Sequence, residues 1–164
     1  MTQEYFGEAI VLNTDFNGDM DLRTSLFTLN FGKIIAKVKS ARKITSKLRG
    51  HIEPANLVLY RIISKKGFQL VDVLKQKKLN LDIKNLYLLD KLLIELEPEE
   101  KLYFDFKREQ FDWNRILKVL GWAPKESECS KCSSKNIKVF HINSQQFFCD
   151  HCSFEISKNE LIYI

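Results

Sequence analysis

The sequence predicts an α+β chain in which a small N-terminal β-barrel is followed by a helical region and a C-terminal segment organised by cysteines. Three observations predict this arrangement. Residues 1–80 hold short apolar runs at strand spacing, residues 81–128 change to the helical period of about 3.6, and residues 129–164 hold all four cysteines. We therefore expect two domains, a barrel over residues 1–80 and a second domain over residues 81–164.

Five strands are expected in the first domain. Their predicted ranges are 8–12, 22–30, 33–39, 56–63 and 68–75. Glycines stand in the gaps, where tight turns need positive φ: Gly18, Gly32, Gly50 and Gly67. Five short strands with one long connection between the third and the fourth are typical of an OB-fold barrel, in which closure removes exposed strand edges. A small SH3-like barrel is the alternative.

Two helices are expected next. Asp82 is a suitable N-cap for a helix that ends before Pro98. Its apolar residues recur at helical intervals: Leu86, Leu89, Leu92, Leu93 and Leu96. Pro98 suits the first turn of a second helix, whose apolar stripe extends to Leu120 before the stop signals Gly121 and Pro124. Residues 129–164 are expected to form a ribbon of short strands.

The cysteines form two Cys-X2-Cys pairs, Cys129 with Cys132 and Cys149 with Cys152, separated by sixteen residues. This spacing is typical of four-cysteine zinc sites. Four thiolates fill a tetrahedral shell and leave no position for water, so we expect one structural Zn²⁺ ion rather than a catalytic one. Free buried thiols and a redox dithiol are the alternatives, and His141 or His151 could replace one cysteine as a ligand.

Composition limits where the protein works. The chain has 164 residues, 45% of them apolar, but it has no apolar run long enough to cross a membrane. Its polar start does not resemble a secretory signal, so we expect a cytoplasmic, nucleoid-associated protein. Thiols stay reduced in that compartment, which favours metal binding over disulfides.

Positive charge is concentrated in the first domain. Residues 1–80 carry 14 Lys or Arg against 7 Asp or Glu, whereas residues 81–128 carry 8 against 11. No acidic residue occurs between Asp21 and Glu53, a stretch with eight cations: Arg23, Lys33, Lys37, Lys39, Arg42, Lys43, Lys47 and Arg49. Strand alternation places Lys33, Lys37 and Lys39 on one face. Such a surface favours a polyanionic partner over an ordinary solvated face.

Residues in two further loops could extend this surface. Lys65 and Lys66 stand at the turn before the fifth strand, and Phe16 lies in the first long loop. The corresponding loops of OB-folds frame the binding face. Aromatic side chains there can stack on nucleic-acid bases, so the sequence favours nucleic acid as the partner. Phosphate-binding loops, zinc-protease helices and nucleophile elbows are absent from the sequence, so we expect no enzymatic activity.

Several segments in this order resemble the bacterial DNA repair protein RecO family. They are residues 8–12, residues 27–33, residues 41–43 with 46–50, the pair Glu53-Pro54, and residues 117–124 leading into Cys129. The resemblance implies an N-terminal OB-fold, a helical region and a zinc ribbon. It also implies DNA contacts at Arg42, Lys43, Lys47 and Arg49, with Lys37 and Lys39 on the adjoining strand.

The resemblance further implies a recombination mediator. RecO proteins bind single- and double-stranded DNA, anneal complementary strands and work with RecR to load RecA onto strands coated by the single-strand binding protein SSB. Against this resemblance, we expect a helical region shorter than in the family, without the helices that would follow Ile164. RecR is therefore the expected protein partner, and SSB binding is left open because SSB docks on the helical domain.

Two other functions remain as alternatives from the residues alone. An RNA-binding or ribosome-associated protein could combine a barrel with a zinc ribbon, because basic surfaces do not distinguish RNA from DNA. A nuclease or other zinc enzyme is the second alternative, against which the fully occupied four-thiolate site argues.

Overall fold

The computed structural model describes residues 3–41, 43 and 46–164. The chain divides into two compact units, Met1–Gln110 and Phe111–Ile164. The sequence placed the boundary near residue 80, about 30 residues earlier. The difference arises because the segment after the barrel packs onto it: the Phe27 ring lies 5.9 Å from the rings of Tyr103 and Phe106.

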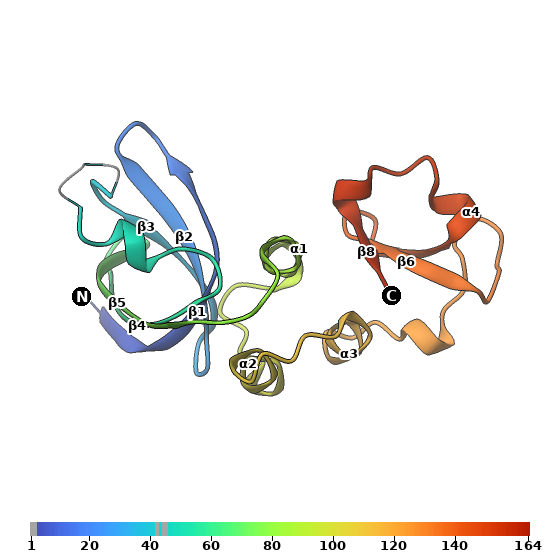
Figure 1. Cartoon of the computed structure of the whole chain (residues 1–164), viewed down its shortest axis with the longest axis horizontal. Coiled ribbons are helices and arrows are strands. Elements are labelled where there is room, and N and C mark those ends of the chain that lie inside the picture. The colour runs from blue at the N-terminus through green and yellow to red at the C-terminus, as the bar shows by residue number, and fades with distance from the viewer. Residues whose placement is uncertain (1–2, 42, 44–45) are drawn as a thin grey trace. The chain divides into compact units, whose positions relative to one another are not determined.

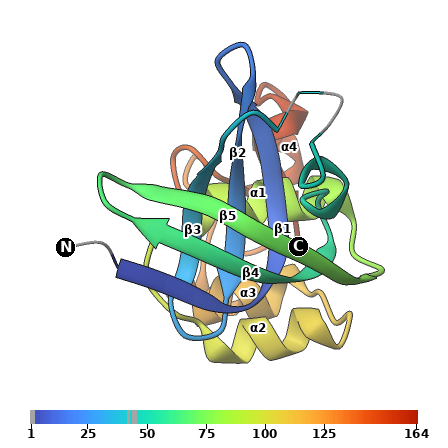
Figure 2. The same ribbon diagram turned by 90° about the vertical axis from the view of Figure 1, so that its left-hand side faces the viewer.

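The first unit contains a closed five-stranded barrel. Its strands are β1 (Gln3–Asn17), β2 (Asp21–Thr28), β3 (Gly32–Val38), β4 (Asn56–Ser64) and β5 (Phe68–Lys78). They follow the order β1-β2-β3-β5-β4, and β1 closes the barrel by antiparallel pairing with β4 (Figures 1 and 2). The OB-fold prediction is confirmed. All five predicted strands are present, and β1 and β5 extend beyond their predicted ends.

One short parallel contact completes the barrel. β3 and β5 pair only at Ala36 with Phe68 and at Lys37 with Gln69. Inward-facing residues fill the barrel with a continuous apolar core that includes Leu26, Ile34 and Ile62, each fully buried. Because the β3–β5 pairing ends at Gln69, the rest of β5 pairs with β4. Its other edge has no strand partner among the described residues.

The helices follow the barrel in chain order: α1 (Ile83–Leu92), α2 (Glu100–Lys107) and α3 (Trp113–Val119). The N-cap prediction is confirmed, because Asp82 Oδ1 accepts a hydrogen bond of 2.8 Å from the Asn85 amide. The single helix expected from Pro98 to Leu120 is wrong. Glu109 adopts a positive φ of 62°, and Asp112 caps a separate helix through the Asn114 amide. Pro98 also lies outside α2, before its N-cap Glu99.

Gly32 holds the start of β3 against the segment after α1. Its φ is +64°, and an added Cβ would lie 2.1 Å from the Glu97 carbonyl oxygen. The neighbouring Lys33 carbonyl oxygen accepts a hydrogen bond of 2.9 Å from the Leu96 amide. Only glycine satisfies both the backbone angle and this close approach.

We predict that Gly32→Ala lowers the free energy of unfolding by more than about 2 kcal/mol, because strained backbone and steric overlap add. Two matched variants separate these causes. Gly18 has φ +74° and Gly50 has no positive φ, and neither has an atom within 4 Å of an added Cβ. Gly18→Ala should cost about 1 kcal/mol and Gly50→Ala less than ~0.5 kcal/mol, measured by urea denaturation. Equal losses for Gly32 and Gly18 would contradict the role of Glu97.

The second unit is built on a three-stranded antiparallel sheet in the order β7-β6-β8. Its strands are β6 (Ile137–His141), β7 (Gln146–Cys149) and β8 (Leu161–Tyr163), and the short helix α4 (Asp150–Ser153) follows β7. A small core of Cys129, Val139, Phe148 and Leu161 lies beside the second cysteine pair. The predicted ribbon of short strands is confirmed.

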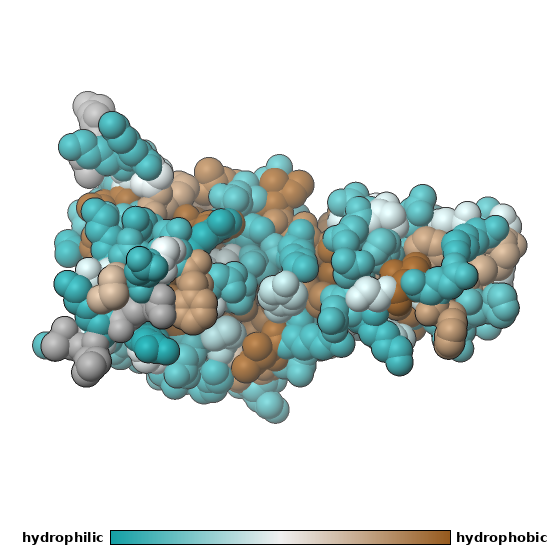
Figure 3. Space-filling model, turned by 90° about the horizontal axis from the view of Figure 1, so that it is seen from above, coloured by the Kyte–Doolittle hydropathy of each residue, from teal (hydrophilic) through white to brown (hydrophobic). Residues whose placement is uncertain are grey.

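Most of the surface in view is hydrophilic. On the face in Figure 3, hydrophobic side chains occur in small groups between polar ones. Of the helices that the structure describes, none combines the length and the apolar character needed to span a bilayer. This face therefore offers mainly polar groups to a ligand.

Candidate nucleic-acid interface and metal centre

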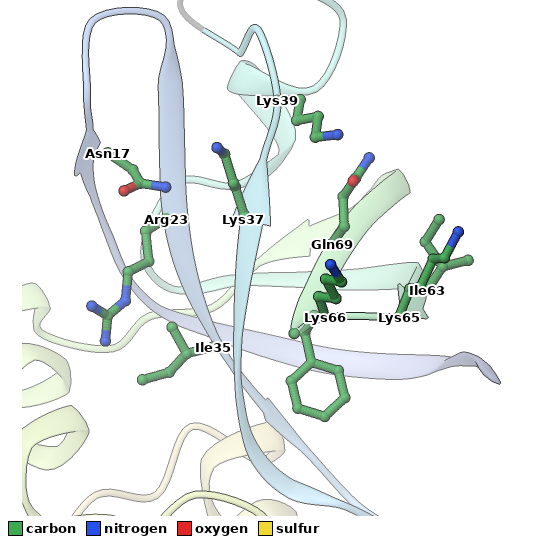
Figure 4. Close-up of a pocket in the computed structure, with 11 residues that line it drawn as sticks. Asn17, Arg23, Ile35, Lys37, Lys39, Ile63, Lys65, Lys66 and Gln69 are labelled. Carbon is green, nitrogen blue, oxygen red and sulfur yellow. The ribbon is translucent and has the colours of Figure 1, made fainter. Parts of the chain in front are cut away.

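An open groove of about 730 Å³ lies on the barrel where β3 approaches the β4–β5 turn (Figure 4). Five of the predicted cations line it, and we call this set the cationic groove: Arg23, Lys37, Lys39, Lys65 and Lys66. They come from β2, the end of β3 and the β4–β5 turn. The parallel contact between β3 and β5 joins these segments, which lie far apart in the sequence.

The residues that line the cationic groove differ in exposure: its five cations are exposed and form what we call the rim, whereas three apolar residues form what we call the floor. Ile35, Ile63 and Phe68 line it and are partly buried. The Phe68 ring meets the Tyr5 ring edge-on at 5.6 Å, which holds its position. A polyanion with flat apolar groups can place its charges on the rim and those groups on the floor.

One carboxylate lies within reach of this groove. Asp21 forms an ion pair of 2.7 Å with Lys37 and accepts a hydrogen bond of 2.8 Å from the Ser40 amide. These bonds, the one from Lys37 first, lower the pKa of Asp21 below its ordinary value. A phosphate that binds Lys37 must therefore compete with Asp21, so this lysine contributes less to binding than a free one.

Lys33 is a correction to the predicted surface. Its side chain is buried, and its Nζ donates a 2.6 Å hydrogen bond to the Asp90 carbonyl oxygen and lies 3.7 Å from Asp90 Oδ1. Ser25 also hydrogen-bonds the Asp90 carboxylate. Alternation assigned Lys33 to the same face as Lys37, but α1 covers that face at Lys33. This lysine therefore fastens the helix to the barrel and is not open to a ligand.

The connection between β3 and β4 holds the remaining predicted cations. Lys43, Lys47 and Arg49 are exposed and do not line the cationic groove. Arg42 lies outside the described residues. Phe16 is 72% exposed near the end of β1, where its neighbour Asn17 lines the groove. Asn17 and Gln69 were missed from the sequence, because neutral polar residues give no charge signal.

The four cysteines of the second unit meet at one point. All four Sγ atoms lie within 4.8 Å of one another, and Cys132 Sγ is 3.7 Å from Cys149 Sγ. A tetrahedral ion with metal–sulfur bonds of about 2.3 Å would place its sulfurs ~3.8 Å apart. A disulfide needs about 2.05 Å, so the cluster fits a metal ion and not cross-links. The cysteines can hold one metal ion, as their spacing predicted.

Local backbone geometry prepares the cluster for a cation. Burial raises the pKa of Cys129, but backbone amides of Cys149, Lys131 and Cys132 outweigh it and lower that pKa to about 6. Burial and the neighbouring thiols raise the pKa of Cys152 to about 12. Without a metal ion, the cluster therefore favours ionisation of Cys129 but disfavours ionisation of further cysteines such as Cys152. A multivalent cation supplies the charge that lets all four ionise.

The histidines do not join the cluster. His141 Nδ1 lies 2.8 Å from Ser144 Oγ and Nε2 lies 3.3 Å from Glu160 Oε2, so both ring nitrogens have other partners. His151 is exposed beside the second cysteine pair, outside the group of possible ligands. His51 accepts a 3.0 Å hydrogen bond from the Lys75 amide at Nδ1, which is a structural role.

The chain combines an OB-fold barrel that carries a cationic groove with a four-cysteine cluster able to hold a metal ion, which places it in a class of small OB-fold proteins with a candidate metal centre. Comparison with known proteins narrows this class. Residues 1–79 match the sequence model of the family described as "Recombination protein O N terminal". This match covers the barrel, and together with the relatives described next it supports a RecO-like identity and a role in DNA repair and recombination.

Three curated relatives extend the match over most of the chain. The DNA repair proteins RecO of Thermoanaerobacter sp. and Caldanaerobacter subterraneus are 26% and 24% identical to it, over 88% and 89% of this chain and 69% and 70% of their own. That of Thermodesulfovibrio yellowstonii is 28% identical, over 91% of this chain and 70% of its own. The similarity therefore includes the second unit as well as the barrel.

Proposed function

We propose that this protein binds single- and double-stranded DNA through the cationic groove, anneals complementary strands and helps to load RecA during repair. The observation that supports this most is the composition of the groove, with five cations around a partly apolar floor. Phosphates can contact the rim and unpaired bases the floor, which favours single strands.

Annealing follows from charge neutralisation. Two complementary strands repel each other through their phosphates, and bound cations reduce that repulsion. The groove contacts only backbone charge and flat base surfaces, so it accepts any sequence and leaves base edges free to pair. This activity needs no catalytic residue. RecR is the partner we propose for the barrel, and SSB is a further candidate.

The four cysteines, in this proposal, hold one structural Zn²⁺ ion. Thiolate ligands in two Cys-X2-Cys knuckles with near-tetrahedral spacing suit zinc, and such sites supply folding energy to segments with small cores. The second unit has such a core. Zinc would therefore support the fold, while the barrel contacts DNA.

The test is annealing of two complementary fluorescent oligonucleotides, with and without SSB and RecR. We expect the protein to accelerate annealing, and binding of a single strand to weaken with salt at a slope of log K against log[salt] near −3, from about four phosphate contacts at ~0.7 each. A structured RNA competitor at matched salt serves as the control. Preferential binding of the RNA, or no acceleration, would contradict the proposal.

A further inference from the structure

The barrel carries a second cationic area that the groove does not include. The last part of β5 contains Lys75, Lys77 and Lys78, and all five residues 74–78 are exposed. Consecutive exposure is unusual in a barrel strand, where alternate residues normally face the core. The alternation continues as far as the buried Val73 and is lost at Leu74, and the pairing of β5 with β4 is irregular between Lys75 and Lys77.

A separate segment brings more charge to the same edge. The 3-10 helix η1 (Arg49–His51) lies against β5, where the Lys75 amide donates to His51 Nδ1 at 3.0 Å. Leu48 packs against the barrel core, and the cations on either side of it, Lys47 and Arg49, are exposed. We call these five residues the lysine edge: Lys47, Arg49, Lys75, Lys77 and Lys78.

The lysine edge is open to a ligand. Lys78 Nζ donates to the Pro54 carbonyl oxygen, but no carboxylate pairs with Lys75 or Lys77 among the described side chains. Lysines also protect free strand edges from pairing with other chains. That role does not require Lys47 and Arg49, which reach the same area from a different segment.

The two cationic areas lie at opposite ends of β5. This strand crosses the front of the barrel in Figure 2, from its turn with β4 toward the side of η1. From Phe68 at the groove to Lys77 at the edge, a strand rise of about 3.3 Å per residue gives ~30 Å. Screening lengths at physiological salt are about 8 Å, so phosphates bound at one area do not repel those at the other.

We propose that the lysine edge is a second binding site for a single DNA strand, occupied together with the cationic groove during annealing. Two strands held on one barrel meet at a high effective concentration, of the order of mM for closely tethered partners. This inference rests on the proposed function of the groove and adds that each protein binds two strands at once.

Three variants with equal loss of charge test the proposal in the whole 164-residue chain. Lys75→Gln with Lys77→Gln alters the edge, Lys39→Gln with Lys66→Gln alters the groove, and Lys84→Gln with Lys101→Gln alters exposed helical lysines as the control. Binding stoichiometry is measured by titration with a ~10-nucleotide oligomer of one sequence, a length within the range of one OB-fold site. Annealing rates are measured by fluorescence transfer, and circular dichroism checks the fold.

We expect two oligomers per chain for the unaltered protein and the control, and one for the edge variant, whose annealing should slow at least tenfold. The groove variant should also lose one oligomer. An unaltered protein that binds one oligomer, or an edge variant that keeps both oligomers and normal annealing, overturns the second site and leaves the groove proposal standing. A groove variant that behaves like the control overturns the proposed function instead.

Discussion

Reversing two charges in the cationic groove, Lys39→Glu with Lys66→Glu, is expected to weaken binding of single-stranded DNA by about 10- to 100-fold at ~0.1 M salt. Each substitution removes an attraction and adds a repulsion, and exposed ion pairs contribute roughly 0.2–1 kcal/mol each. Both side chains are exposed at the rim, so the barrel should remain folded. Fluorescence anisotropy with a labelled oligonucleotide measures the change.

The matched control for this reversal is Lys84→Glu with Lys101→Glu, which makes the same change in net charge on α1 and α2. If binding depended on net charge alone, both pairs would weaken it equally. We expect the control to lose less than about threefold. Equal losses in the two variants would show that the groove has no special role.

Loss of one thiolate through Cys149→Ser is expected to unfold much of the second unit. Structural zinc in small domains contributes about 10 to 16 kcal/mol of apparent binding free energy, more than a small core supplies. Amide hydrogen exchange should show that the amides of β6 and β7 lose their protection. The measured zinc content should fall from one Zn²⁺ per chain to a substoichiometric level. Chelation of the unaltered protein should give the same exchange pattern.

Ser130→Ala provides the control, because Ser130 stands between Cys129 and Cys132, is exposed and is not one of the possible ligands. DNA binding by the Cys149→Ser variant should stay within about threefold of the unaltered protein, since the cationic groove lies in the other unit. Protected β6 and β7 amides without metal would contradict a structural role for the ion. Complete loss of DNA binding with an intact barrel would assign the second unit a direct part in recognition.

Lys33 illustrates where sequence reasoning stopped. Strand alternation places Lys33 on the same face of β3 as Lys37, because successive side chains point to opposite faces of any strand. What covers that face is a separate matter: α1, some fifty residues later in the chain, places Asp90 against the lysine. The break between α2 and α3 was missed for a related reason. Glu109 takes a positive φ without the glycine that usually marks such a position, and the sequence analysis did not consider Asp112, which caps α3 in the structure.

The lysine edge is likewise visible in part from the sequence and in part only from the tertiary structure. The run Lys75-Gln76-Lys77-Lys78 is visible in the sequence, and its exposure would be expected from its charge. Arg49 lies near this run because the 3-10 helix η1 packs against β5, where the Lys75 amide donates a hydrogen bond to His51 Nδ1. No periodicity within either segment indicates that contact.

The sequence by itself determined the strand positions, the α1 cap and the cysteine pairs, because alternation, capping and ligand spacing act between residues close in the chain. Only the tertiary structure decided which cations share a surface. Lys37, Lys65 and Lys66 meet because β3 and β5 pair in parallel at two positions, and Lys33 is removed because a helix packs over it. Those contacts join distant segments, and their energies depend on the whole barrel having closed.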